Sequence, residues 1–374
     1  MKNKIYSYFF HEFIRYFTVS LFALVVVIWT IQSVNLLDLV TDDGHAFTIY
    51  FTYSILSLPK ILTKLIPFSF LIAVILTIIK LERDNELIIL WTSGLNKIHI
   101  VNLIFRISIL ITFIQLLMAV FINPSTLNYS RAILKNSQLQ FIPSLLKERQ
   151  FNDTVEGLTI FVDKKNLDGT YSNIFIRDDN SILTKVSNVS STIFAKSGFI
   201  SKESKSLVLL NGNIQRLNQS GAISIVKFEK TELNLAGIST KTISEPKIQE
   251  TPTIQIIQCM RKINAFSQNC TRDRKNAMDT KIEINRRIGI PLFIPIIGML
   301  SCFLLSTRRE SKISAYNKYI YFLLGFSFLV IAEITVRYSG FSIKHTFFYY
   351  LFPAIMFPLI YFNLIRKFKY ENLK

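Results

Sequence analysis

Long apolar stretches lie at the two ends of the 374-residue chain, and a polar stretch separates them. A membrane-spanning helix needs about 20 mostly apolar residues. Three segments before the polar stretch and three after it meet this requirement: residues 16–37, 58–79, 98–122, 288–305, 319–336 and 347–365. The first apolar run is longer than the core of a signal peptide and no small-residue cleavage site follows it, so we expect a retained span. The pattern predicts six transmembrane helices.

The polar stretch has the pattern of an all-β domain from residue 123 to about residue 250. Short runs rich in β-branched and aromatic residues alternate with the turn signals Asp168-Gly169, Asn211-Gly212 and Ser220-Gly221. A helical pattern returns at residues 254–264. Such strands are typical of a sandwich, a jelly roll or a partly open barrel. The predicted strands are residues 157–162, 171–177, 192–196, 206–210, 213–217 and 222–229.

These patterns predict an α-helical integral membrane protein with an inserted all-β extracytoplasmic domain between helices 3 and 4. We expect residues 1–122 to contain the first three spans and residues 286–374 the last three. Residues 123–285 would form the β-domain, jellyroll-like in shape, with a helical connector after it.

Composition supports a membrane protein and excludes several other classes. The chain is 50% hydrophobic and only 18% charged, whereas soluble domains carry about 25% charged residues. Its 12 Gly, 10 Pro and 3 Cys exclude collagen, disorder and a disulfide scaffold. The net charge of +18 is largely carried by the flanks of the spans and is otherwise spread thinly, without a basic cluster. Nucleic-acid binding is therefore not expected.

The distribution of Lys and Arg predicts the orientation of the spans, because short cytoplasmic loops carry an excess of these residues. With the N-terminus inside, the short outer loops hold only Arg337 and Lys344. Arg286 and Arg287 before the fourth span run against the rule, but long translocated domains do not follow it. Both termini are therefore expected to be cytoplasmic. The inner flanks hold Lys2, Lys4, Arg15, Lys80, Arg83, Lys97, Arg308, Arg309, Lys312, Lys318, Arg366, Lys367, Lys369 and Lys374.

No catalytic or metal-binding motif occurs in the sequence. The patterns GxxxxGK[ST], GxSxG, HExxH and CxxC are all missing, and the four His residues are scattered along the chain. We therefore expect no catalytic residue, no metal and no cofactor. Cys259 and Cys270 lie on the outer side, where they could pair or stay free, and Cys302 lies within a span.

The inner loop between the second and third spans predicts a short amphipathic helix at about residues 82–94. Asp84 and Glu86 lie at its start, and Gly94 lies where the helix would end. Two interpretations remain open. The helix could lie on the membrane surface with its apolar side chains in the interface, or it could dock in the groove of a partner whose cation meets the carboxylates. The apolar side chains are Leu87, Leu90 and Trp91.

Four ionisable residues at the outer ends of spans are candidates for substrate contact. Lys60 and Lys64 share one helical face, and they either extend toward outer headgroups or capture an anionic lipid head. Glu333 and Arg337 have the same spacing in the fifth span, so they could form a structural ion pair or contact substrate.

The order of these features resembles the LptF/LptG (YjgP/YjgQ) family of lipopolysaccharide-export permeases. The resemblance covers nearly the whole chain, and the β-domain segments are more similar to LptF than to LptG. It rests on YFFHEFIRYF at 8–17, Pro59 and Pro67, Glu86 with SGLNK at 93–97, EGLTIFV at 156–162, IFIRDD at 174–179 and EINRRIGIPL at 283–292.

The resemblance implies a non-catalytic subunit of an ABC transporter in the bacterial inner membrane. Its partners would be an LptG-like six-helix permease, an LptB-like ATPase dimer and an LptC-like β-jellyroll protein, and its substrate lipopolysaccharide. Glu86 matches the coupling carboxylate of the family, with Asp84 and Gly94 in the same loop helix, and Arg337 matches a basic position. Residues 31–38 depart from the family pattern because they contain no Lys or Arg.

Three other interpretations remain. The chain could be the LptG-type paralogue of the same transporter. A glycolipid-modifying membrane enzyme would need clustered His, Asp and Glu at one membrane face, which the sequence lacks. An envelope-ligand receptor would not need an acidic inner loop helix.

Overall fold

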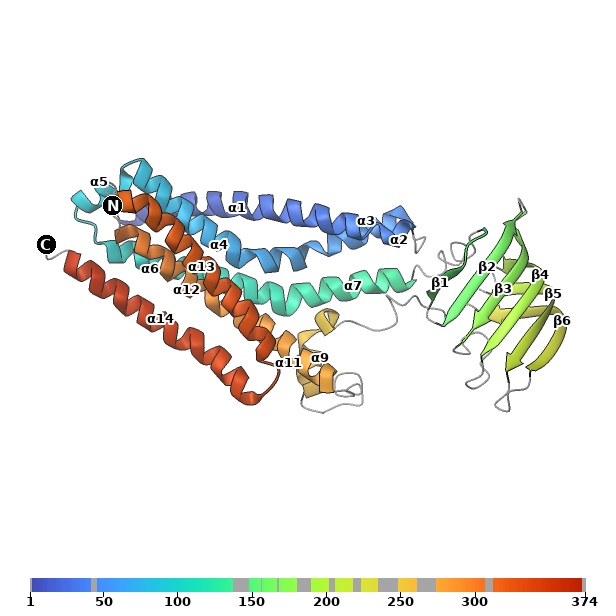
Figure 1. The fold of residues 1–374 in the computed structure, drawn as a ribbon. Coiled ribbons are helices and arrows are strands. Elements are labelled where there is room, and N and C mark those ends of the chain that lie inside the picture. The colour runs from blue at the N-terminus through green and yellow to red at the C-terminus, as the bar shows by residue number, and fades with distance from the viewer. Residues whose placement is uncertain are drawn as a thin grey trace. The chain divides into compact units, whose positions relative to one another are not determined.

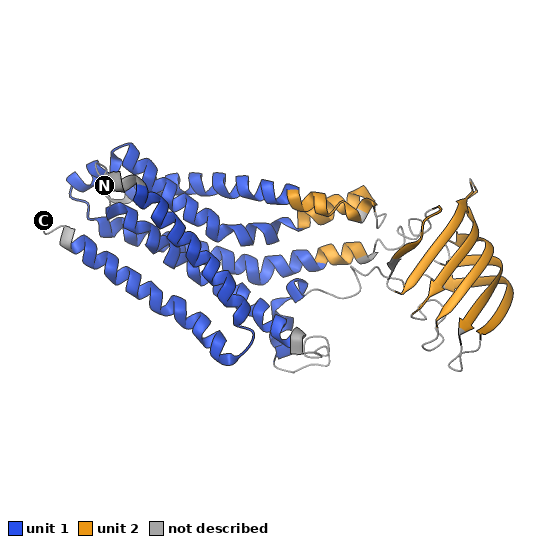
Figure 2. Cartoon of the chain, in the orientation of Figure 1, with its two compact units in different colours: residues 1–30, 57–128, 247–374 blue, residues 31–56, 129–246 orange. Residues whose placement is uncertain are grey.

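The computed structural model describes residues 2–41, 46–136, 148–155, 157–166, 168–179, 190–201, 206–217, 223–234, 248–260, 274–306 and 312–371. The chain forms two compact units, coloured separately in Figure 2. Unit 1 comprises residues 1–30, 57–128 and 247–374, and unit 2 comprises residues 31–56 and 129–246.

The long helices of the chain lie in unit 1 for most of their length (Figure 1). They are α1 (Lys2–Asn35), α4 (Leu58–Arg83), α6 (Lys97–Leu117), α13 (Lys312–Tyr338) and α14 (Ile343–Glu371). A π-helix, η1 (Met118–Ile122), continues α6 into α7 (Asn123–Asn136). The shorter elements are α2 (Asp38–Thr41), α3 (Phe47–Leu56), α5 (Glu86–Thr92), η2 (Ile248–Glu250), α9 (Thr253–Met260), α11 (Arg274–Gly289), η4 (Ile290–Phe293), α12 (Ile294–Ser301) and η5 (Cys302–Ser306).

Six helical stretches within the described ranges are long and apolar enough to cross a membrane, which confirms the predicted number. The predicted spans fall inside these stretches except at the end of the first, where the helix stops at Asn35. The stretches are Lys4–Asn35, Phe47–Arg83, Lys97–Leu134, Ala277–Ser306, Tyr316–Tyr338 and Ile343–Lys369.

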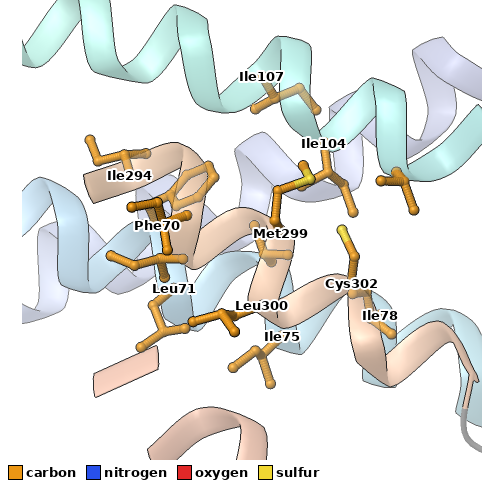
Figure 3. Packing of buried hydrophobic residues seen from close by; sticks show 14 of the residues in the cluster. Phe70, Leu71, Ile75, Ile78, Ile104, Ile107, Ile294, Met299, Leu300 and Cys302 are labelled. Atoms are coloured by element: carbon orange, nitrogen blue, oxygen red, sulfur yellow. The ribbon is translucent and has the colours of Figure 1, made fainter. Parts of the chain in front are cut away.

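The core of unit 1 lies where α4, α6 and α12 pack together. Figure 3 shows Phe70 of α4, Ile104 of α6 and Met299 of α12 in one cluster of buried side chains. The ring of Tyr349 packs directly on Gly289, where a Cβ would clash with the ring. Small residues permit such approaches between membrane helices.

One part of the predicted β-domain is helical. Residues 123–136 form α7, which continues the third span instead of beginning the β-structure. Leu127, Ser130 and Leu134 are buried at helical spacing, so burial on one helix face overrides the local preference of this polar segment.

Unit 2 contains one antiparallel sheet with its strands in chain order, β1-β2-β3-β4-β5-β6. One face carries the apolar core, formed by alternate residues such as Leu158, Ile160 and Val162 of β2. The sheet confirms the predicted β-structure, and it is an up-and-down meander over the described residues. The strands are β1 (Asn152–Val155), β2 (Leu158–Lys165), β3 (Thr170–Asp178), β4 (Ser191–Ser201), β5 (Ser206–Leu217) and β6 (Ile223–Asn234).

Of the three predicted turns, one is confirmed and one is wrong. Gly169 joins β2 to β3 with φ +76°. Asn211-Gly212 instead lies inside β5, where Asn211 has φ 49° and has no paired residue in either neighbouring strand. The pairings before and after Asn211 keep the same register with both neighbours, so the strand continues through this pair without a bulge. Position 212 requires a glycine because a Cβ there would clash with the carbonyl oxygen of Phe194. Ser220-Gly221 lies outside the described residues.

Candidate functional site

The two ends of the helix bundle in unit 1 carry different polar clusters. One end of the bundle, here called the α5 end, contains α5, the N-terminal turns of α1 and the last turns of α14. The other end, here called the α11 end, contains α11, η1, η2 and α9. Among the site residues predicted from sequence, Asp84, Glu86 and Gly94 lie at the α5 end.

The loop helix α5 is shorter than the predicted 82–94. α4 continues through Arg83, and the turn at Asp84 and Asn85, with Asn85 at φ 60°, lets α5 begin at Glu86. Gly94 has φ +82°, its N–H donates to the carbonyl of Trp91, and the next N–H donates to the carbonyl of Leu90. This is a Schellman motif, which ends a helix at a glycine.

α5 has one face against the bundle and one face exposed. Leu87 is buried, and Leu90 and Trp91 pack against the bundle core. Ile88 and Ile89 are 51% and 63% exposed. The apolar group therefore divides: part of it attaches α5 to its own chain, and part of it remains on the surface. Isolated exposed apolar residues are common, whereas here two adjacent isoleucines are exposed beside a carboxylate.

Glu86 takes part in a hydrogen-bonded chain of four side chains, here called the Lys80 network. The Lys80 ammonium lies 2.9 Å from Glu12 Oε1 and donates to the Tyr8 hydroxyl at 3.0 Å. The Tyr8 hydroxyl donates to Glu86 Oε1 at 2.9 Å. Glu12 Oε2 is buried without a hydrogen-bond partner among the described residues. The network joins α1, α4 and α5.

An apolar cavity of about 330 Å³ lies beside this network. It is lined by α1, the last turns of α4, α5 and the first turns of α6. Phe9, Leu81, Ile89 and Ile100 supply apolar lining, and Glu86 lies at its wall. α5 therefore does not pack tightly against α1, so its attachment on that side depends on few contacts.

The α11 end is organised around Arg287, whose side chain is only 4% exposed. The cluster formed by Arg287 and its partners is here called the Arg287 node. A guanidinium has five N–H donors, and five oxygen atoms accept hydrogen bonds from Arg287. These acceptors are Glu283 Oε1 at 3.0 Å, the Thr251 carbonyl at 3.0 Å, Thr253 Oγ1 at 2.8 Å, the Ile248 carbonyl at 3.4 Å and the Gln249 carbonyl at 3.0 Å.

The Arg287 node also reaches the π-helix of the third span. The Thr253 hydroxyl, which accepts from Arg287, donates to the carbonyl of Val120 at 2.7 Å. η1 leads from α6 into α7, and η2 and α9 come directly after the β-strands in the chain. The node therefore ties together the segments of unit 1 through which the chain leaves for the sheet and returns from it.

The two arginines that oppose the orientation rule are both neutralised by acidic partners. Arg286 lies 2.8 Å from Glu333 Oε1 on α13 and 3.8 Å from Glu283. Glu333 therefore pairs with Arg286 of α11 and does not form the predicted ion pair with Arg337. Arg337 makes no ion pair in the described part of the chain, and its side chain is exposed.

The lysines predicted to contact substrate lie in the first two turns of α4. Lys64 is exposed, and Lys60 is half-buried with an interaction of its own. Lys60 and Lys64 lie at the end of α4 opposite to Lys80. The sequence-predicted residues therefore occupy separate places in unit 1 rather than one site.

The chemistry available at these places is that of ion pairs and hydrogen bonds. The described residues contain no group of three His, Cys, Asp or Glu side chains that could hold a metal ion. Cys259 is disulfide-bonded, Cys302 is a buried free thiol, and Cys270 lies outside the described residues.

Sequence reasoning missed Tyr8, Glu12, Lys80 and Arg287 as members of polar clusters. A signal existed for two pairs, because Tyr8 and Glu12, and Glu283 and Arg287, are spaced i,i+4 on one helix face. The partner on another helix, however, cannot be read from spacing along one helix.

Comparison with known proteins assigns the family. Residues 7–367 match the family described as lipopolysaccharide export system permease LptF/LptG. The chain is also similar to the uncharacterized protein RP871 of Rickettsia prowazekii (strain Madrid E), with 28% identity over 243 residues. That alignment covers 63% of this chain and 64% of the relative. Because the family match extends over nearly the whole chain, this six-span protein with its β-sheet insert belongs to the LptF/LptG family of lipopolysaccharide export permeases.

Proposed function

We propose that this chain is the LptF-type permease subunit of a lipopolysaccharide-export ABC transporter, and that α5 is the helix through which a separate ATPase drives it. One observation carries the proposal. The helix between the second and third spans exposes Ile88 and Ile89 beside Glu86, while Leu87 attaches it to the bundle. An amphipathic helix of this kind fits a groove on a partner protein.

The chemistry of the docking contact follows from these side chains. Two exposed isoleucines would be covered by an apolar groove of an LptB-like ATPase subunit. The second oxygen of Glu86 would accept a charge-assisted hydrogen bond from a Lys or Arg of that groove. Asp84, which pairs with the exposed Arg83 at 3.3 Å, would add a weaker attraction. Gly94 would fix the end of α5 relative to the start of α6.

The proposal includes an orientation in the membrane. The excess of Lys and Arg in the flanks at the α5 end predicts that this end and both termini are cytoplasmic. The β-sheet of unit 2 would then be periplasmic. Arg286 and Arg287 fit this orientation because Glu333 and Glu283 neutralise them, so they add little positive charge on the outer side.

The substrate path would lie between this chain and an LptG-like partner. α1 supports this arrangement: Phe22 and Val19 are 72% and 64% exposed, so its apolar surface is available to lipid or to a second permease. Lys64 and Arg337 are exposed cations that would meet phosphate groups of lipopolysaccharide, and Lys60 lies one helical turn from Lys64. Glu333 would act indirectly, by holding Arg286.

The sheet of unit 2 would receive the extracted lipopolysaccharide. Its edge strands β1 and β6 pair on one side only, among the described residues, and such edges accept a further strand. A jellyroll-like assembly with the sheet of an LptC-like protein would extend this surface across the periplasm.

Co-purification in mild detergent tests the coupling assignment. We expect the wild-type chain to recover an ATPase, a six-span paralogue and bound lipopolysaccharide. Glu86→Ala should lower the recovery of the ATPase more than Asp84→Ala, and Glu232→Ala on β6, a carboxylate in an exposed pair with Lys230, is the matched control. Recovery of this chain alone, or equal ATPase recovery with Glu86→Ala and the control, would refute the assignment.

Crosslinking tests the proposed substrate contacts. A photoreactive lipopolysaccharide should label the Lys60→Ala, Lys64→Ala double variant less than the wild-type chain. Equal labelling would show that these lysines only extend toward headgroups.

A further inference from the structure

We infer that Tyr8 is the positioning residue that transmits displacement of α5 to the membrane helix α1. The inference rests on the proposed function of α5 and adds how its movement reaches the rest of the chain. It starts from the position of the Tyr8 hydroxyl between Glu86, at the first position of α5, and Lys80, in the last turn of α4.

Only a hydroxyl can make both of these bonds with a single atom. The Tyr8 oxygen accepts a hydrogen from the Lys80 ammonium at 3.0 Å and donates its own hydrogen to Glu86 Oε1 at 2.9 Å. Lys80 is held in turn by Glu12 at 2.9 Å, one helical turn further along α1. The ring of Tyr8 also lies 5.3 Å from the Lys80 nitrogen, which adds a cation–π contact.

On the side of α5 that faces α1, the Tyr8–Glu86 hydrogen bond is the main polar link between the two helices. The cavity of about 330 Å³ separates parts of α1 and α5, and its lining contains both Tyr8 and Glu86. Close-packed surfaces transmit small displacements by themselves, whereas a cavity absorbs them. A displacement of α5 toward or away from α1 would therefore reach α1 through the Tyr8–Glu86 hydrogen bond.

The same hydrogen bond controls how Glu86 is presented. With Oε1 held by Tyr8, the carboxylate has a fixed orientation, and no partner of its other oxygen is recorded among the described residues. A cation of the ATPase that moves Glu86 would stretch or break this bond. Tyr8 would then be left with Lys80 as its partner. The two arrangements differ in contact energy, which is what coupling between two states requires.

Tyr8→Phe tests the inference, because it removes one hydroxyl and keeps the ring. The measurement is the amount of lipopolysaccharide released per ATP hydrolysed by the complete transporter reconstituted in nanodiscs. We expect the ratio to fall between about 2-fold and about 10-fold, the range for the loss of one hydrogen bond. Tyr6→Phe, a variant of the same chemistry in the same helix and cavity wall, is the matched control and should keep the wild-type ratio.

A double variant separates positioning from general damage. If Tyr8 acts through Glu86, then Tyr8→Phe combined with Glu86→Gln should lower the ratio no further than the more severe single variant. The thermal midpoint of Tyr8→Phe should match that of Tyr6→Phe, since the hydroxyl lies at the surface. Additive losses in the double variant, or a wild-type ratio in Tyr8→Phe, would overturn the inference.

Recovery of the ATPase in the same preparations distinguishes this inference from the proposed function. Tyr8→Phe should recover as much ATPase as wild type, because Glu86, Ile88 and Ile89 remain in place. Normal ATPase recovery with an unchanged ratio overturns the role of Tyr8 alone. Failure of the wild-type chain to recover any ATPase overturns the coupling assignment of α5, and the role of Tyr8 with it.

Discussion

The Lys80 network and the Arg287 node lie at opposite ends of the same helix bundle and differ in how completely they are satisfied. In the Arg287 node a guanidinium with a 4% exposed side chain finds an acceptor for each donor. In the Lys80 network the Lys80 and Glu12 side chains are 17% and 11% exposed, Glu12 Oε2 is unpartnered among the described residues, and Tyr8 is exposed. We call the Arg287 node closed, because every donor of its guanidinium has an acceptor within the protein. We call the Lys80 network open, because it retains an exposed tyrosine and a carboxylate oxygen that has no partner in the described part of the chain.

This difference indicates different tasks. Buried polar groups that are fully satisfied rigidify a structure, because any rearrangement leaves a donor or acceptor without a partner. The Arg287 node therefore holds the returning segment at Ile248–Glu250 and Thr253 in one position. A cluster that ends in the half-buried carboxylate Glu86 can exchange partners at little cost, because water or a partner protein replaces the lost bond.

The largest expected effect is on the closed cluster. Arg287→Gln should lower the free energy of unfolding of the chain in detergent micelles by about 3–5 kcal/mol, because it leaves the largely buried Glu283 carboxylate without its principal cation. Thermal unfolding monitored by intrinsic fluorescence measures the change. A loss smaller than about 1 kcal/mol would contradict the closed character of the node.

A paired variant sharpens this prediction. Arg287→Met together with Glu283→Met removes both charges, and replacing a buried ion pair by apolar residues of similar volume is often neutral. We therefore expect the double variant to be more stable than Arg287→Gln. If it is less stable, the hydrogen bonds to the returning segment, rather than the charge of Glu283, determine the stability of the node.

An intermediate effect is expected in the open cluster. Lys80→Gln should lower the free energy of unfolding by about 2 kcal/mol, the scale for hydrogen bonds to charged groups. The loss is smaller than for Arg287 because solvent reaches Lys80 and Glu12 more easily. The same unfolding assay measures it, and Lys64→Gln, an exposed lysine in the same helix, is the control. A loss equal to that of Arg287→Gln would remove the distinction between the two clusters.

The sequence predicts much of the fold because its strongest signals are local. The apolar runs gave the six spans, and the alternating runs gave the strands from β2 to β6. The predictions of local structure were wrong where contacts with residues distant in the sequence determine the conformation. Asn211-Gly212 has the composition of a hairpin turn, but it lies inside β5, where the carbonyl of Phe194 and the ring of Phe228 are so close to position 212 that only a glycine fits. Likewise, burial of Leu127 and Leu134 keeps residues 123–136 helical.

The candidate site was predictable only in part, for the same reason. Charge spacing and a terminal glycine were sufficient to find the loop helix and Glu86. Tyr8 lies 78 residues from Glu86 along the chain, so no local pattern connects them. Arg287 counted only as an exception to the orientation rule, because its partners on the returning segment become visible only in three dimensions.

The smallest expected effect separates the hydrogen bonds of the Arg287 node from its charges. Thr253→Val removes a hydroxyl that accepts from Arg287 at 2.8 Å and donates to Val120 at 2.7 Å, while the shape of the side chain is kept. We expect a loss of about 1 kcal/mol in the free energy of unfolding. Thr253→Ser keeps the hydroxyl and should lose less. If Thr253→Val loses no stability, or less than Thr253→Ser, the hydroxyl does not link the node to η1. If only Val is destabilising, this hydroxyl helps to tie the returning segment to the third span.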